Sequence, residues 1–211
     1  VAMEYDPSAA ENLAWSLHYG GMTEEAVAAG LYACRKAPGD TGVLLSICDL
    51  LSAAGRFPVA DSLCRAATEA FPGDPAVWRA RGMVLGTAER YAEAGEALAV
   101  SFQLDSTSYD TASLLGEALL FQDRYPEAEV WLERSLELDP AAVFSICYLG
   151  LIRERMGDPS GALDRYLEAL RITPGYTYAE ERIRYVSGPS YDVGYWRSES
   201  RPFSASIWAD L

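Results

Sequence analysis

The fold of this chain is decided by residues 109–142, which read YDTASLLGEALLFQDRYPEAEVWLERSLELDPAA. Gly116 falls in a first apolar-periodic segment, and Ala128 and Leu132 fall in a second one with the spacing of a single helical face. Pro140 closes the second segment, because proline cannot continue a helix. The stretch therefore predicts two helices joined by a short turn.

The same pattern returns every 34 residues on both sides of this stretch. The glycine recurs as Gly82 and Gly150. In the third copy, Ser106 replaces the closing proline. In the other copies the closing position holds Pro38, Pro72, Pro140 and Pro174. A fixed period of this length, with this pattern of small, aromatic and proline residues, resembles the tetratricopeptide repeat. The resemblance covers residues 7–176.

The resemblance implies an all-α protein, a right-handed α-solenoid of about five helix pairs followed by a capping helix and an aromatic-rich tail. The expected organisation is an N-terminal extension (1–6), five repeats (7–40, 41–74, 75–108, 109–142 and 143–176), a capping helix (177–187) and a tail (188–211). We expect the capping helix itself near 177–186, because a terminal unit must cover an otherwise exposed apolar surface.

The net charge of −14 comes mainly from the repeats, because residues 1–176 hold 26 of the 31 acidic and 13 of the 17 basic residues. An acidic surface repels phosphate backbones, so the sequence predicts no nucleic-acid partner. No stretch approaches the ~20 apolar residues that span a bilayer, so it also predicts no membrane insertion. We expect a cytoplasmic rather than an exported protein. Because the chain opens on Val1 and not on Met, its natural start can lie upstream, and export stays open.

The sequence offers little chemistry, and we predict neither catalysis nor a cofactor nor a metal. His18 is the only histidine, and there is no Gly-rich phosphate loop, no HExxH motif and no paired-cysteine zinc pattern. Cys48 and Cys64 fall at buried packing positions of the second repeat. For these and for Cys34 and Cys147, we favour reduced structural thiols over disulfides or metal ligands.

In proteins of this family the first helix of each repeat lines a concave groove, and certain positions along it face the ligand. Carried onto this sequence, those positions predict a peptide-binding groove lined by Trp15, Leu45, Asp49, Arg79, Met83, Leu114, Glu117, Phe121, Tyr148, Leu151 and Arg155. Most of the lining is apolar, and its acidic residues are Asp49 and Glu117. Met and aromatic side chains suit adaptable peptide surfaces. The alternative for any single residue is a place in the core between repeats.

Family members that clamp the terminal carboxylate of a peptide use Lys, Asn and Arg at these positions. This chain has Leu45 and Asp49 there and no lysine in the groove, which argues against such a clamp. We therefore predict a non-enzymatic interaction scaffold whose partner is another protein or peptide, apolar or with basic edges. Two alternatives stay open: a dedicated chaperone of the kind that serves bacterial secretion systems, and a regulatory segment of a larger enzyme.

The tail after residue 188 is unusually rich in aromatic residues for a disordered segment. Exposed aromatic side chains at that density are an association hazard, so we expect Phe203, Ile207 and Trp208 to be buried. They could dock in the chain's own groove, which would be autoinhibitory, or in the groove of a second copy, which would make a homo-oligomer. The alternative is that the upstream aromatics wrap the capping helix while the last residues stay disordered.

Overall fold

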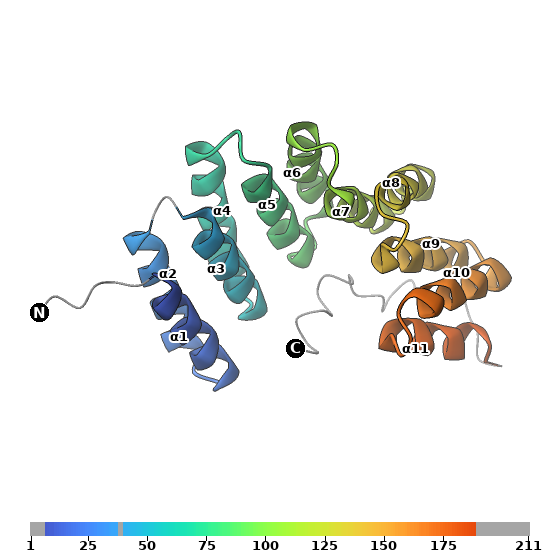
Figure 1. The fold of residues 1–211 in the computed structure, drawn as a ribbon, viewed down its shortest axis with the longest axis horizontal. Helices are drawn as coiled ribbons and strands as arrows, with labels where there is room; N and C mark the ends of the chain where they lie inside the picture. Colours follow the sequence, from blue (N-terminus) through green and yellow to red (C-terminus); the bar gives the residue numbers. More distant parts are fainter. Residues whose placement is uncertain (1–6, 38–39, 189–211) are drawn as a thin grey trace, which may run out of the picture. The chain divides into compact units, whose positions relative to one another are not determined.

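The computed structural model describes residues 7–37 and 40–188, and all eleven regular elements in those ranges are α-helices (Figure 1). They are α1 (Pro7–Tyr19), α2 (Thr23–Lys36), α3 (Thr41–Ala53), α4 (Phe57–Ala70), α5 (Pro75–Thr87), α6 (Tyr91–Leu104), α7 (Tyr109–Leu120), α8 (Tyr125–Leu138), α9 (Val143–Arg155), α10 (Pro159–Ile172) and α11 (Thr177–Val186). The predicted all-α fold is confirmed, because no strand occurs in either range.

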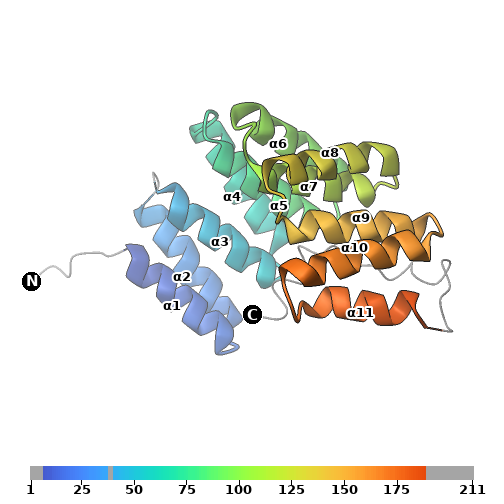
Figure 2. The same ribbon diagram turned by 45° about the vertical axis from the view of Figure 1, so that its right-hand side comes forward.

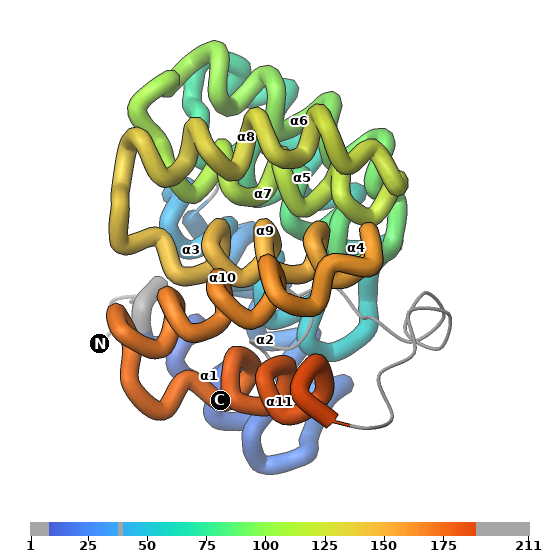
Figure 3. Tube along the Cα trace, turned by 90° about the vertical axis from the view of Figure 1, so that its right-hand side faces the viewer, coloured from blue at the N-terminus to red at the C-terminus, as the bar shows by residue number. Residues whose placement is uncertain are grey.

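The chain divides into two units, with α1–α6 in unit 1 and α7–α11 in unit 2. Within each unit, every odd-numbered helix up to α9 packs against the helix that follows it. The first helices of successive repeats also touch one another, α1 with α3 and α3 with α5 in unit 1, and α7 with α9 in unit 2. In unit 2, α8 to α11 run side by side, as Figures 2 and 3 show. Each unit thus has one layer of first helices and one layer of second helices.

The backbone repeats with the same period as the sequence. The turn inside each helix pair contains one residue with a positive φ: Gly21 (77°), Gly55 (68°), Glu89 (61°), Asp123 (58°) and Gly157 (79°). Glycine adopts this left-handed conformation without the steric penalty that a Cβ atom brings. Two of the five repeats nevertheless place a side chain there, so the turn geometry is imposed by the packing of the two helices.

A glycine marks the point where the two helices of a repeat cross. A Cβ atom on Gly116 would lie 2.5 Å from Cγ of Leu132, and one on Gly150 would lie 2.7 Å from Cε1 of Tyr166. Real Cβ atoms essentially never approach other atoms that closely. Both glycines are therefore required by the close approach of the helices, which explains why the glycine recurs with the repeat.

The last helix, α11, begins 34 residues after the first residue of α9 and so stands where a further first helix would begin. A buried ion pair anchors it to the repeat before it: Arg182 of α11 donates from Nε to Oε2 of Glu154 on α9 over 3.2 Å, and its Nη2 contacts Oε1. The hydroxyl of Tyr166 on α10 donates to the same Oε2 over 2.9 Å. Three helices therefore meet at one carboxylate, and the predicted capping helix is present.

Candidate functional site

Five of the predicted groove residues lie on α1, α3 and α5 and retain partly exposed side chains: Trp15, Leu45, Asp49, Arg79 and Met83. We call the surface they form the first-helix face of unit 1. Trp15, Asp49 and Met83 stand at equivalent positions of successive repeats, 34 residues apart. Contacts between α1 and α3 and between α3 and α5 make this a continuous surface within unit 1.

An aromatic group forms one end of this face. The indole Nε1 of Trp15 donates a hydrogen bond to Oγ of Ser46 over 2.9 Å, which ties α1 to α3. The ring of Trp15 stacks on Tyr19 with 5.7 Å between centroids, and it meets the ring of His18 edge-on at 5.9 Å. Trp15 and Leu45 also pack against the buried core of unit 1. The only histidine is thus part of an aromatic cluster on α1.

The carboxyl group of Asp49 is the charged feature of the face. Burial raises the pKa of Asp49 to about 6, and the positive charge of Arg79 on α5 opposes the shift. The anionic form is therefore poorly solvated, although it still predominates at neutral pH. A carboxylate in this condition beside apolar side chains is a suitable partner for a cation that arrives with a ligand.

The equivalent positions in unit 2 are filled with packed side chains. Glu117, Tyr148 and Leu151 are only 6%, 3% and 2% exposed. Tyr148 and Leu151 belong to a buried cluster against which Tyr176 and Tyr178 pack, just before and within α11. Burial, together with the nearby Glu117 carboxylate, raises the pKa of Tyr148. These three residues, which the sequence assigned to the groove, are packing residues of unit 2, because large neighbouring side chains cover them.

The remaining predicted groove residues, Leu114, Phe121 and Arg155, are partly exposed in unit 2. The guanidinium of Arg155 lies over the ring of Phe121, 5.3 Å from its centroid, and Nη1 is 3.6 Å from Oδ1 of Asp123. The same Oδ1 accepts a hydrogen bond from the Tyr125 hydroxyl over 2.6 Å. The charges of Arg155 and Asp123 therefore offset each other at this end of unit 2.

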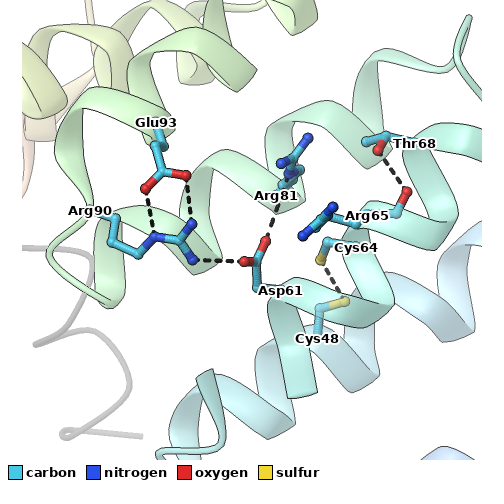
Figure 4. Close-up of polar contacts among 8 residues, drawn as sticks. All are labelled: Cys48, Asp61, Cys64, Arg65, Thr68, Arg81, Arg90 and Glu93. Carbon is cyan, nitrogen blue, oxygen red and sulfur yellow. Dashed lines mark hydrogen bonds and ion pairs between the residues drawn. The ribbon is translucent and has the colours of Figure 1, made fainter. Parts of the chain in front are cut away.

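A charged cluster contributed by α4, α5, α6 and the turn before α6 was not anticipated from the sequence (Figure 4). Oδ2 of Asp61 accepts from Nη1 of Arg90 over 2.7 Å, while Nε of Arg81 lies 3.8 Å from Oδ1. Arg90 also donates to Glu93 over 2.5 Å and 2.7 Å. Arg81, which stands where the repeat family prefers leucine, was the one sequence signal of this cluster.

A shallow cavity of about 330 Å³ borders this cluster. Its lining residues all come from one side of α4: Pro58, Asp61, Ser62, Arg65, Ala66 and Glu69. A hollow bounded by a single helix gives a ligand few convergent groups, so we do not take it as a binding site.

The described residues include no group of three or more His, Cys, Asp or Glu arranged to hold a metal ion. All four cysteines carry free thiols, and Cys48 and Cys64 are fully buried, as their place in the repeat predicts. None of the helices in the described ranges combines the length and the apolar character needed to cross a membrane. Phe203, Ile207 and Trp208 lie outside the described residues, so their docking remains a prediction.

Comparison with known families places residues 47–109 on the model of the tetratricopeptide repeat. That match lies inside a longer run of helix pairs with the same 34-residue period. Residues 47–109 therefore belong to the tetratricopeptide repeat family. A comparison with curated protein sequences finds no match.

Solved structures of tetratricopeptide repeat proteins share the fold. TTC0263, a thermophilic protein of Thermus thermophilus, aligns with a TM-score of 0.73 at 16% identity and covers 86% of this chain and 99% of its own. MamA from Desulfovibrio magneticus RS-1, from residue 41 to its end, gives 0.64 at 18% identity and covers 83% and 99%. YrrB, described as having an unusual peptide-binding site, gives 0.58 at 18% identity and covers 83% and 91%.

These likenesses confirm the predicted α-solenoid fold. Tetratricopeptide repeat proteins bind other proteins or peptides and are generally non-enzymatic, so the chain has the fold of a protein-interaction scaffold. The fold does not name the partner, because one architecture serves many ligands. The choice of ligand therefore has to be argued from the surface.

Proposed function

We propose that this tetratricopeptide repeat protein binds a peptide with an apolar centre and Arg or Lys at its edges, on the first-helix face of unit 1. The observation that carries the proposal is Asp49, a half-buried carboxylate on α3. Leu45 precedes it by one helical turn, and Met83 occupies the equivalent position of α5. The first-helix face of unit 2 is less suitable, because the equivalent side chains there are buried.

The chemistry of the face favours this ligand class for two reasons. Trp15, Leu45 and Met83 offer partly exposed apolar surface, which a peptide can cover with a gain from the hydrophobic effect. Asp49 has lost part of its hydration, so a guanidinium or ammonium group near it recovers electrostatic free energy that water no longer supplies. The attraction requires the ionised form, so binding of a basic peptide should weaken as the pH falls below about 6.

The similarity to YrrB supports the class of function only. That protein is described as a tetratricopeptide repeat protein with a peptide-binding site, and the likeness to this chain is one of fold. The assignment of a peptide to the first-helix face of unit 1 rests on the side chains of this chain.

Two synthetic peptides would test the proposal, with the same apolar centre and either arginine or glutamate at both ends. Fluorescence anisotropy of the labelled peptides would give their affinities for the full chain at pH about 7.5 and about 5, on either side of the Asp49 pKa. At the higher pH we expect the arginine peptide to bind on the order of tenfold more tightly than the glutamate peptide. One charge contact of about 1.4 kcal/mol would give this difference.

The variant Asp49→Asn should remove most of that preference. Glu96→Gln is the matched control, because it removes the same charge from an exposed position of α6 in the second-helix layer of unit 1. Equal affinities for the two peptides, or equal losses in the two variants, would show that the overall acidic charge and not this face selects the ligand.

A further inference from the structure

The second repeat differs from all the others at the point where its two helices cross. In the third, fourth and fifth repeats this crossing pairs a glycine of the first helix with a large side chain of the second: Gly82 with Leu98, Gly116 with Leu132, and Gly150 with Tyr166. In the first repeat the equivalent residues are Ala14 and Gly30. The second repeat places a cysteine on each side, Cys48 on α3 and Cys64 on α4.

The two thiols are in direct contact. Sγ of Cys48 lies 2.9 Å from Sγ of Cys64, and neither residue exposes any surface. Figure 4 shows the two sulfur atoms facing each other. A disulfide bond has an S–S length of about 2.04 Å, so the sulfur atoms need to approach by only about 0.9 Å more. Both residues belong to the interior of regular helices, Cys48 to α3 and Cys64 to α4, so the contact joins two well-defined elements.

We infer that Cys48 and Cys64 are a dithiol site that is reversibly oxidised to a disulfide by a small-molecule disulfide of the glutathione class. The bond would join α3 to α4 within the second repeat. This inference is independent of the proposed peptide ligand, because it concerns the core of unit 1 and not its first-helix face.

The reaction is an ordinary thiol–disulfide exchange and balances without a further reactant. The thiolate of one cysteine attacks a sulfur of the oxidant RSSR, which forms a mixed disulfide and releases RS⁻. The thiolate of the other cysteine then attacks the protein sulfur of that mixed disulfide and releases a second RS⁻. The protons of the two thiols go to the two released thiolates, so two Cys–SH and one RSSR give one Cys–S–S–Cys and two RSH.

Access controls the rate of this exchange. The contact with Cys64 is the main cause that raises the pKa of the Cys48 thiol, and burial is the second. Burial also raises the pKa of the neighbouring thiol of Cys34 on α2, to about 11. Thiols in this state are poor nucleophiles at neutral pH. The first attack therefore requires a local separation of α4 from α3. Once the disulfide has formed and the two helices have packed together again, the bond is shielded from reductants.

A metal site and simple packing are the two alternatives to a redox pair, and each makes a different prediction. As a metal site the pair would need further ligands, and no group of three or more suitable residues exists among those that the structure describes. As simple packing it would need no particular chemistry, because the chain itself fills the same crossing with Gly and Leu in its third and fourth repeats. The double variant Cys48→Gly/Cys64→Leu therefore separates packing from thiol chemistry.

The test incubates the full chain with oxidised glutathione at a sub-denaturing urea concentration, then counts free thiols and maps disulfides by mass spectrometry. We expect the count to fall from four to two, with Cys48 linked to Cys64. Non-reducing thermal melts should show a midpoint about 5–10 °C higher than reduced protein, because the bond closes a loop and so lowers the conformational entropy of the unfolded chain. The Cys48→Gly/Cys64→Leu variant should fold, keep its two other thiols free and show no shift.

Cys34→Ala serves as a second control, because it removes the neighbouring thiol and leaves the pair intact. It should form the Cys48–Cys64 bond as the unchanged protein does. The inference is overturned if native protein gains no such bond, if the bond forms only after complete unfolding, if Cys34 is required, or if the oxidised protein melts at a lower temperature.

Discussion

The two units use equivalent positions of the same repeat in opposite ways. In unit 1 the face of the first helices keeps Asp49 and Met83 partly exposed, whereas in unit 2 the corresponding Glu117 and Leu151 are buried. Tyr148 accounts for part of the difference, since a large ring stands in unit 2 where unit 1 has the small residues Ser46 and Ala80. The repeat thus supplies a scaffold position, and the size of its neighbours decides whether that position is surface or core.

The helix α11 contributes to the same difference. Tyr178 near its start and Tyr176 just before it pack against the buried cluster that contains Tyr148 and Leu151, so the last helix completes the core of unit 2. The Glu154–Arg182 ion pair holds the helix in place. The first-helix face of unit 2 is closed by packing, and loss of the last helix should affect this unit most.

The largest expected effect comes from removing the carboxylate that anchors α11. Glu154→Ala should destabilise the protein by about 3–5 kcal/mol, because it leaves the buried Arg182 without its counter-ion. Urea unfolding measures this loss. Glu168→Ala on α10 removes only a partly exposed i,i+3 ion pair with Arg165 and should cost less than about 1 kcal/mol. Equal losses in the two variants would mean that the buried pair does not hold α11.

A second variant tests the helix crossing on which the packing of unit 2 depends. Gly150→Leu should cost about 1–3 kcal/mol, because the new side chain would be forced against Tyr166. Gly86→Leu in unit 1 is the control, since a Cβ atom there meets nothing within 4 Å. The two melting temperatures give the comparison, and an unchanged value for Gly150→Leu would refute the alignment of the repeats.

The ionisation of Asp49 distinguishes unit 1 by its pH dependence. Its pKa of about 6 in the folded state exceeds its ordinary value of 3.8, so protonated Asp49 contributes stability that is full below pH 3.8 and is lost as the pH rises through 6. Asp49→Asn cannot lose this contribution, so at pH about 7 it should be the more stable protein by on the order of 1–2 kcal/mol. Urea midpoints across the pH range measure the difference, and a constant difference would contradict the assignment.

The smallest effect concerns the turns. Glu89→Gly in unit 1 should stabilise the protein by about 0.5–1 kcal/mol, because glycine removes the Cβ penalty of a left-handed residue. Asp123→Gly at the equivalent turn of unit 2 should gain less or even lose stability, since Asp123 accepts a hydrogen bond from Tyr125. Thermal melts compare the two variants, and a larger gain for Asp123→Gly would show that this hydrogen bond contributes nothing.

Most of the fold could be predicted from the sequence, because patterns within one short segment specify each helix pair and the segment is repeated. The 34-residue period, the crossing glycines Gly116 and Gly150 and the start of α11 all follow from patterns within one repeat. The charged cluster around Asp61 could not be predicted, because Arg90 reaches it from 29 positions further along the chain. The direct contact of Cys48 with Cys64 was likewise missed, although both were placed correctly at packing positions.

The sequence by itself determined an acidic, all-helical chain of tetratricopeptide repeats, because helix periodicity and the alternation of small and large residues are properties of short segments. Only the tertiary structure decided which first-helix residues remain available to a ligand. Asp49 and Glu117 occupy the same place in their repeats, yet one stays partly exposed and the other is buried. The physical reason is that burial depends on side chains brought in from other helices, and these differ from one repeat to the next.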